Sequence, residues 1–436
     1  MNIRTVMVLG ANGSMGRNVS AIFASFGNAK VYMMCRDMQR AEKARQDAAK
    51  TVRAGVIAEK LIPVTYDSLK EVVAESDLIF ESVAEDYEIK NEVNQKVIPY
   101  LKNEALLCSG TSGLSIDKLA AKLPEYVACR YTGMHFFNPP YSMTLCELIP
   151  SAKMEQKTID AICNYLKSKL YRTVAVVKDQ AAFLGNRIGF FFINEALQYA
   201  EKYKDKGGIE YIDSVLGPFT GRNMPPIVTA DFVGLDVHKA IVDNVWYNSA
   251  DCSLESFKLP RYVEELISQG KMGRKSGEGL YKTVKNDRGI KETLVYNLID
   301  SQYKVKNSSK CKSVEKVVEA LRNGGYHKAA GELRNGSNAE LELARDFLVR
   351  YLVYALHTAK QVAYDLFSAD DVMATGFNWI PPLAVIDAFG GKACVKELIR
   401  ECDLNNIDLS LKEIEDLVME APVSKYDYRT FLKAKY

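Results

Sequence analysis

The sequence has no long apolar run: its 436 residues contain nothing near the ~18 consecutive apolar residues of a membrane-spanning helix. The apolar start at 5–10 runs into glycines, so we expect no secretory signal peptide. Charge of one sign is not in excess either, since 57 basic and 55 acidic residues give a formal net charge of +2. We therefore expect neither nucleic acid nor an anionic membrane surface as a partner.

Histidine is scarce, and cysteine lacks the spacing of a structural framework. The four histidines show no H-E-x-x-H spacing, so no metal is expected. The nine cysteines are odd in number and form no C-x-x-C pair, which argues against a set of disulfides. A reducing compartment fits this usage best, and we expect a cytoplasmic protein.

The first part of the chain alternates short apolar runs with helical patterns. The runs are TVMVLG (5–10), KVYMMC (30–35), LIFESV (78–83), ALLCSGT (105–111) and TGMHFF (132–137). Alternating strands and helices of this length predict a parallel, doubly wound sheet. The first part is therefore expected to be an α/β domain.

The pattern changes near Lys178, after which we expect no further strands. From Phe183 onward the sequence indicates helices broken by loops such as GPFTGRNMPP (217–226) and GKMGRKSGEG (270–279). A chain of this length exceeds what one hydrophobic core usually serves. We expect an α/β domain over 1–179, a helical domain over 180–283 and a second helical domain over 284–436, so the fold class is α/β followed by all-α.

The helical part contains a spacing that occurs twice. The pattern P-P-x4-D-x-x-G stands at 225–234 and again at 381–390, and each copy follows a long helical pattern, at 186–199 and 349–362. The second copy lacks counterparts of Asn186 and Glu195. We interpret it as a structural duplicate without a site of its own. The alternative is a chance likeness between two proline-containing helix junctions.

A glycine-rich loop, GANGSMG (10–16), follows the first apolar run and opens a helical stretch. In a Rossmann unit such glycines allow a tight turn and a close backbone approach to a pyrophosphate, while the helix N-terminus offers N–H groups to the phosphates. The spacing G-x-x-G-x-x-G is one residue longer than the common dinucleotide pattern. The context nevertheless predicts a dinucleotide site, and a purely structural turn is the alternative.

The end of the second run bears on the choice of dinucleotide. An acidic residue usually accepts hydrogen bonds from the adenosine ribose at this place, but Cys35 occupies it and Arg36 and Asp37 follow. Arg36 could pair with the 2′-phosphate of NADP, or simply point to solvent, whereas Asp37 could reach a ribose hydroxyl. NAD and NADP both remain open.

His135 ends the run at 132–137, at the edge where ligands bind in doubly wound sheets. Oxidation of a secondary alcohol needs a base for the hydroxyl proton, and imidazole suits it because its ordinary pKa is about 6.5. A carboxylate behind the ring would orient it, and Glu147 in the apolar run LCELIP (145–150) is the candidate. Taken alone, a histidine at a strand end is more often a satisfied core residue than a catalyst, and such a glutamate is often simply a salt-bridge partner.

Several ordered motifs together carry a family resemblance. They are ESVAE (81–85) followed by Lys90, SGTSGLSI (109–116), HFFNP (135–139) with its glutamate twelve residues after the histidine, Lys178-Asp179 with Phe183 and Asn186-Arg187, DFVGLD (231–236) and GEGLY (277–281). From Thr5 to about Lys282 the chain resembles the 3-hydroxyacyl-CoA dehydrogenases of fatty acid β-oxidation. Departures from the family pattern are the longer glycine loop, Cys35, and Gly113 where many relatives have serine.

The resemblance implies roles for individual residues. His135 would be the catalytic base, Glu147 its orienting partner, and Ser112 and Asn186 the groups that bind and polarise the substrate oxygen. Simpler alternatives are a helix cap for Ser112 and an exposed helix-face charge for Lys90. With the glycine loop and the end of the second run included, the expected cofactor-binding residues are Gly10, Asn12, Gly13, Ser14, Met15, Gly16, Arg36, Asp37, Glu85, Lys90 and Asn138.

The implied activity is reversible oxidation of a 3-hydroxyacyl-CoA to a 3-ketoacyl-CoA, with NAD as cofactor and NADP still open. The partner is then an acyl-CoA substrate, and because helical domains of this family commonly pair, a homodimer is compatible with it. No stretch can hold a hydratase domain, so we expect a dehydrogenase alone. The alternatives are a related dehydrogenase of a smaller hydroxy substrate, such as carnitine or a sugar acid, and a dinucleotide-binding subunit without activity.

Overall fold

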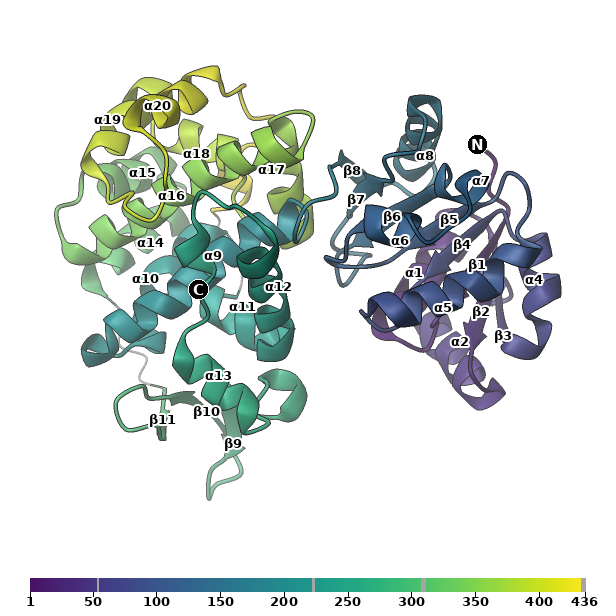
Figure 1. The fold of residues 1–436 in the computed structure, drawn as a ribbon. Helices are drawn as coiled ribbons and strands as arrows, with labels where there is room; N and C mark the ends of the chain where they lie inside the picture. The colour runs from purple at the N-terminus through teal and green to yellow at the C-terminus, as the bar shows by residue number, and fades with distance from the viewer. Residues whose placement is uncertain (53–54, 222–223, 307–310, 433–436) are drawn as a thin grey trace. The chain divides into compact units, whose positions relative to one another are not determined.

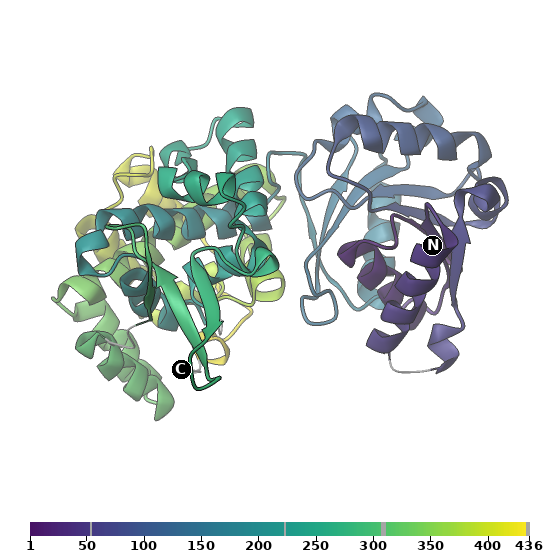
Figure 2. The same ribbon diagram turned by 90° about the horizontal axis from the view of Figure 1, so that it is seen from below.

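The computed structural model describes residues 1–52, 55–221, 224–306 and 311–432. These residues form two compact units, which are coloured by residue number in Figures 1 and 2. Unit 1 comprises Met1–Phe183 and Val362–Tyr364, and unit 2 comprises Leu184–Gln361 and Asp365–Tyr436. None of the described helices is long and apolar enough to cross a membrane.

Unit 1 is built on an eight-stranded sheet in the order β3-β2-β1-β4-β5-β6-β7-β8. The strands are β1 (Thr5–Leu9), β2 (Lys30–Cys35), β3 (Leu61–Thr65), β4 (Leu78–Glu81), β5 (Leu106–Ser109), β6 (Tyr131–Phe136), β7 (Leu145–Pro150) and β8 (Thr173–Val176). The strand order reverses between β1 and β4, which is where ligands bind in open α/β sheets. The predicted doubly wound α/β fold is confirmed by this sheet.

Three strands of this sheet, β3, β7 and β8, were not predicted, and one pairing departs from the expected parallel arrangement. β7 pairs antiparallel with β6, whereas every other neighbouring pair in the sheet is parallel. β3 contains Pro63, which weakens its strand pattern and is tolerated because β3 lies at the edge of the sheet.

Helices cover both faces of the sheet in unit 1 (Figures 1 and 2). Alternate residues of β1 lie on opposite faces, so that Val6 and Val8 join the apolar core formed with α1, α2 and α8. The helical segments are α1 (Ser14–Ser25), α2 (Met38–Val52), α3 (Gly55–Ala58), η1 (Tyr66–Ser68), α4 (Leu69–Glu75), α5 (Tyr87–Val97), η2 (Ile98–Tyr100), α6 (Ile116–Ala120), α7 (Glu125–Ala128) and α8 (Gln156–Ser168).

Unit 2 is mainly helical, as predicted, and several of its helices pack against α9. Its first elements are α9 (Gly185–Lys202), η3 (Lys204–Lys206), α10 (Ile209–Thr220), α11 (Pro226–Val233), α12 (Leu235–Asn248), η4 (Leu254–Phe257), α13 (Arg261–Ser268), η5 (Arg274–Ser276), β9 (Tyr281–Lys285), β10 (Lys291–Tyr296) and β11 (Tyr303–Val305). They are followed by α14 (Lys312–Arg322), α15 (Tyr326–Asn335), α16 (Ala339–Val362), α17 (Phe367–Val372), η6 (Met373–Phe377), α18 (Pro382–Ala388), α19 (Lys392–Glu401), α20 (Leu411–Glu420) and η7 (Tyr428–Thr430).

The packing of α9 against α16 forms the centre of unit 2. The rings of Phe191 and Tyr354 stack with their centroids 3.9 Å apart. Glu195 and Arg350, both buried, form an ion pair with an N–O distance of 3.1 Å. α9 is therefore buried around nearly its whole circumference, which explains its high content of phenylalanine and isoleucine.

Two predictions for this half of the chain were wrong. The strands do not stop at Lys178, because β9, β10 and β11 form a three-stranded antiparallel sheet (Figure 1). β9 has no fully buried residue and carries two lysines among its five residues, so no apolar run marks it. The loop predicted at 217–226 begins too early, since α10 continues through Pro218 and ends before Gly221, whose φ of 84° terminates the helix. Residues 222–223 of that loop lie outside the described part.

Candidate active site

His135 and Glu147 face each other across the β6–β7 hairpin. They are directly opposed in the antiparallel register, and the distance between His135 Nδ1 and Glu147 Oε2 is 2.7 Å. The twelve-residue spacing in the sequence is thus the length of a hairpin that returns the glutamate beside the histidine. Both side chains are buried, so the carboxylate holds the ring in one orientation and Nε2 is directed away from the pair.

Two phenylalanines pack against the imidazole of His135. The ring centroids of His135 and Phe137 are 4.5 Å apart, and those of His135 and Phe183 are 5.7 Å apart. Phe183 and the preceding Ala182 both have positive φ, at 54° and 59°, which is uncommon outside glycine. This unusual backbone turns the Phe183 ring towards the histidine, and no residue pattern predicts it.

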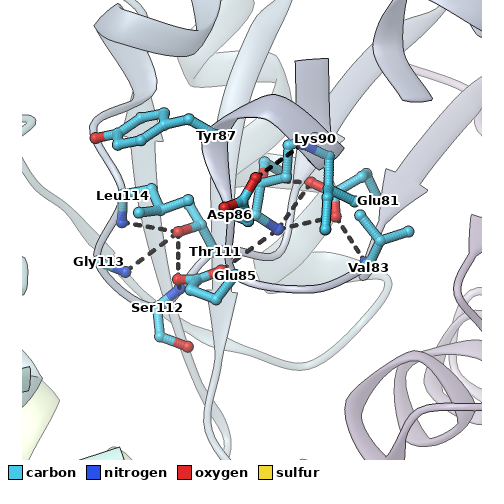
Figure 3. Close-up of polar contacts among 12 residues, drawn as sticks. Glu81, Val83, Glu85, Asp86, Tyr87, Lys90, Thr111, Ser112, Gly113 and Leu114 are labelled. Carbon is cyan, nitrogen blue, oxygen red and sulfur yellow. Dashed lines mark hydrogen bonds and ion pairs between the residues drawn. The ribbon is translucent and has the colours of Figure 1, made fainter. Parts of the chain in front are cut away.

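A buried ion pair lies at the carboxyl ends of β4 and β5 (Figure 3). Lys90 Nζ donates to both carboxylate oxygens of Glu81, at 2.9 and 3.1 Å, and the two side chains are 1% and 0% exposed. Glu81 also accepts hydrogen bonds from Ser109 Oγ and from the Val83 N–H, both at 2.7 Å. Lys90 is therefore not the exposed helix-face charge that was the alternative interpretation.

Glu85 connects this pair to the predicted substrate serine. One of its oxygens lies 3.4 Å from Lys90 Nζ, and the other accepts hydrogen bonds of 2.6 Å from Thr111 Oγ1 and from the Ser112 N–H. Ser112 is exposed, and it does not cap a helix. The cap of α6 is Ser115, whose hydroxyl accepts from the Lys118 N–H.

The glycine loop fits a pyrophosphate. Gly10 has φ of 72°, and a Cβ there would lie 2.4 Å from the Ser82 carbonyl oxygen, so only glycine fits between β1 and β4. Gly16 is equally restricted, because its Cβ would lie 2.6 Å from the Gly10 carbonyl oxygen. The first intrahelical bond of α1 runs from the Arg17 N–H to the Gly13 carbonyl. The N–H groups of residues 14–16 therefore precede it and are placed for an anion.

The end of β2 offers one carboxylate to a ribose. Cys35 is buried, and burial raises the pKa of its thiol although the Asn12 N–H opposes the shift, so a neutral thiol stands where an acid was expected. Asp37 directly precedes α2, accepts from the Arg40 N–H at 2.8 Å and pairs with the Arg40 guanidinium at 3.1 Å. Arg36 and Asp37 are both exposed. Asp37 is thus the acid nearest the expected position.

The last two predicted residues lie on different units. Asn138 is exposed just after β6, and its Oδ1 accepts from Asn18 Nδ2 of α1 at 3.1 Å, so it lies beside the helix of the glycine loop. Asn186 is buried in the first turn of α9, in unit 2. Unit 1 therefore brings together His135 with Glu147, and Ser112 with Glu85 and Lys90.

Sequence reasoning missed Glu81 and Thr111. Each has a visible signal, since Glu81 is an acid that ends the apolar run LIFE and Thr111 directly precedes the predicted substrate serine. A charge that ends a buried strand needs a partner, and Lys90, nine residues later, is that partner.

Comparison with known proteins agrees with these motifs. The model of the 3-hydroxyacyl-CoA dehydrogenase NAD-binding domain matches residues 5–180, and that of the 3-hydroxyacyl-CoA dehydrogenase C-terminal domain matches residues 183–283. A probable 3-hydroxyacyl-CoA dehydrogenase of Bacillus subtilis is 26% identical over 340 residues, which is 78% of this chain and 42% of that protein. A 3-hydroxybutyryl-CoA dehydrogenase of Bradyrhizobium diazoefficiens is 34% identical over 241 residues, which is 55% of this chain and 78% of that protein.

A solved structure extends the likeness to nearly the whole fold. The crystal structure of 3-hydroxybutyryl-CoA dehydrogenase from Escherichia coli matches 96% of this chain and 99% of that chain with a TM-score of 0.69 at 19% identity. It supports an N-terminal Rossmann-like unit followed by a helical region. The chain spans about half the length of the first curated relatives it matches. From the two domain models and the motifs they contain, the chain belongs to the 3-hydroxyacyl-CoA dehydrogenase family.

Proposed function

We propose that the protein catalyses the reversible oxidation of 3-hydroxyacyl-CoA to 3-ketoacyl-CoA with NAD. The observation that carries the proposal is the buried His135–Glu147 pair with its 2.7 Å contact. Family membership supports the acyl-CoA substrate class and a nicotinamide cofactor. The nine cysteines are all free thiols, which accords with the reducing, cytoplasmic location that we also propose.

In the proposed mechanism His135 moves the proton of the substrate hydroxyl. Glu147 engages Nδ1, so Nε2 is the nitrogen that takes the proton during oxidation and returns it during reduction. The carboxylate stabilises the imidazolium that forms. Ser112 and Asn186 are assigned to the substrate oxygens, where charge builds up during the reaction. A nicotinamide, when bound, would supply the hydride acceptor.

The cofactor is assigned to the β1–β4 edge of unit 1. The glycine loop, with Gly10, Asn12, Gly13, Ser14, Met15 and Gly16, would hold the pyrophosphate. Glu85 and Asn138, which are exposed, are assigned to the nicotinamide half, and buried Lys90 acts there through the Glu85 carboxylate, 3.4 Å from its Nζ. Arg36 and Asp37 are assigned to the adenosine half. We propose NAD rather than NADP because Asp37 is the carboxylate at the end of β2, and a carboxylate accepts ribose hydroxyls but repels a 2′-phosphate.

One assay tests both assignments. Acetoacetyl-CoA and longer 3-ketoacyl-CoAs are offered with NADH and with NADPH, and 3-dehydrocarnitine and a keto sugar acid serve as alternative substrates. We expect turnover of the acyl-CoA substrates, with kcat/KM at least about tenfold higher for NADH, since one unfavourable charge contact of about 1.4 kcal/mol changes affinity tenfold. Turnover of only the smaller substrates, or a preference for NADPH, would contradict the respective assignment.

A further inference from the structure

The hydroxyl of Thr111 uses all of its hydrogen-bonding capacity within the loop that carries Ser112. It donates to Glu85 Oε1 at 2.6 Å and accepts from the N–H groups of Gly113 and Leu114, at 3.2 and 2.8 Å (Figure 3). A hydroxyl offers one donor and two acceptor positions, so none remains. Thr111 is fully buried, and this excludes it from direct contact with a substrate.

The second anchor of the loop is the Glu85 carboxylate. A single oxygen, Oε1, accepts from Thr111 Oγ1 and from the Ser112 N–H, both at 2.6 Å, so the position of the Ser112 backbone follows that of the carboxylate. In Figure 3 the Ser112 side chain extends away from this carboxylate. The place from which its hydroxyl extends is thus determined by a backbone that Glu85 holds.

Glu85 is held in turn by charge. Its Oε2 lies 3.4 Å from Lys90 Nζ, and Lys90 is fixed by the two oxygens of buried Glu81. Lys90 and Glu81 are inaccessible, whereas the Glu85 side chain is 43% exposed. The buried pair therefore orients Glu85 from the interior, and Glu85 and Thr111 together orient the loop.

We propose that Thr111 is a positioning residue, which acts with Glu85 to hold Ser112 in the geometry that binds the substrate oxygen. Because the role of Ser112 belongs to the proposed function, this inference rests on it. One buried hydroxyl, that of Thr111, aligns the loop between β5 and α6 through three hydrogen bonds. Lys90 contributes to the same alignment through Glu85. A displacement of about 1 Å at a reacting group lowers turnover by as much as 10²-fold.

A double-mutant cycle with acetoacetyl-CoA and NADH tests the proposal. Thr111→Val keeps the shape of the side chain and removes the hydroxyl, Thr111→Ser keeps the hydroxyl, and Ser112→Ala removes the group that is positioned. We expect Thr111→Val to lower kcat on the order of 10- to 100-fold, Thr111→Ser to restore most of it, and Thr111→Val in the Ser112→Ala background to change kcat less than about twofold, since neighbouring groups that act together are not additive. Equal effects in both backgrounds would overturn the proposal.

Hydrogen exchange gives a readout that does not depend on activity. The amides of Gly113 and Leu114 should exchange faster in Thr111→Val than in the wild type and regain protection in Thr111→Ser, because Thr111 Oγ1 is their acceptor. The Ser112 N–H keeps its acceptor, Glu85 Oε1, in both variants. Unchanged exchange in a folded Thr111→Val variant would overturn the proposal. If Thr111→Val does not fold, Glu85→Ala replaces it and removes the acceptor of the Ser112 N–H. A wild type that binds NADH but does not reduce acetoacetyl-CoA would refute the proposed function alone, and the exchange data would still decide whether Thr111 orders the loop.

Discussion

Among the individual residues, the proposed proton transfer depends on the groups that hold His135. Glu147 contacts Nδ1 at 2.7 Å, and Phe137 and Phe183 pack on the ring, so the imidazole has little freedom to turn. The carboxylate has both an orienting and an electrostatic effect, whereas the phenylalanines only restrict the ring. A neutral replacement of Glu147 therefore removes the charge beside the ring and leaves the packing of the two phenylalanines in place.

For Glu147→Gln we expect kcat to fall on the order of 10²- to 10⁴-fold, because the neutral amide neither stabilises the imidazolium nor enforces the correct tautomer. Steady-state kinetics with acetoacetyl-CoA and NADH measure the effect. Glu155→Gln is the matched control and should retain full activity, because Glu155 is exposed and pairs with Lys157 at the surface. Full activity in Glu147→Gln would remove the carboxylate from the mechanism.

The glycines of the phosphate loop make a second prediction at this scale. Gly10→Ala should lower the free energy of unfolding by about 1 to 3 kcal/mol, because its φ of 72° and the Ser82 carbonyl oxygen 2.4 Å from its Cβ both oppose a side chain.

Gly13→Ala should leave stability nearly unchanged, since φ is −67° and the nearest atom is 3.4 Å from its Cβ. It should instead weaken NADH binding, measured by fluorescence titration, because the Cβ enters the space assigned to the pyrophosphate. Equal NADH affinity in Gly13→Ala and the wild type would contradict that assignment.

Several of these residues could be predicted from the sequence, and others could not. The candidate pair of His135 and Glu147 was visible because Glu147 stands in an otherwise apolar run and belongs to the motif of the family resemblance. The hairpin that brings the two together was not predicted, since β7 was not recognised as a strand. The burial of Lys90 could not be predicted, because the segment YEIKNEVNQK has the polar composition of a solvent-exposed helix. Its partner Glu81 lies at the end of a strand, and an ion pair between a strand and a helix produces no periodic pattern in the sequence.

Among the helices of unit 2, the two copies of the predicted duplication share one more feature, a hydrogen bond at the start of a helix. Asp213 Oδ1 accepts from the N–H of Ile227, the residue after the second proline at the start of α11, and Asp370 Oδ1 accepts from the N–H of Leu383, the residue after the second proline at the start of α18. Two helices with the same proline start are thus capped by a buried aspartate from a preceding helix. The duplication stays a prediction, and this shared cap favours it.

These caps give unit 2 a stability that depends on pH. Burial raises the pKa of Asp213 to about 7 from an ordinary value of 3.8, although hydrogen bonds from Tyr281, Ile227 and Val228 oppose the shift. Burial likewise raises the pKa of Asp370 to about 7. A raised carboxyl pKa means that the folded state favours the protonated form, so the stabilisation is full below pH ~4 and is lost as the pH rises through about 7.

We therefore expect the wild type to unfold at a lower temperature at pH 8 than at pH 6. The slope is at most about 1.4 kcal/mol per pH unit for each group, and less once the protein has relaxed around the charge. Asp213→Asn keeps a neutral acceptor and should make the melting temperature depend less on pH, as measured by calorimetry. Asp205→Asn, at an exposed position, is the control. A melting temperature for Asp213→Asn that falls as steeply as that of the wild type would contradict the assignment.

At the scale of the whole molecule, the order of fold classes was predictable and the small sheet of unit 2 was not. The strands of the large sheet are buried on both faces, so they appear in the sequence as apolar runs. The strands β9, β10 and β11 are less buried and contain many polar residues, so they show no such run. The first unit also includes Val362–Tyr364 from far along the chain, where the Lys178 N–H donates to the Val362 carbonyl at 2.7 Å. No local pattern predicts such a long-range contact.

The central claim is that one imidazole in unit 1 carries the proton transfer of a 3-hydroxyacyl-CoA dehydrogenase. The most direct test compares the wild type with His135→Gln in the reduction of acetoacetyl-CoA by NADH, with NADH affinity measured in parallel and the exposed His327→Gln as the matched control. The account predicts a kcat lower on the order of 10²- to 10⁴-fold in His135→Gln, with NADH affinity unchanged and His327→Gln fully active. Near wild-type kcat in His135→Gln would contradict it.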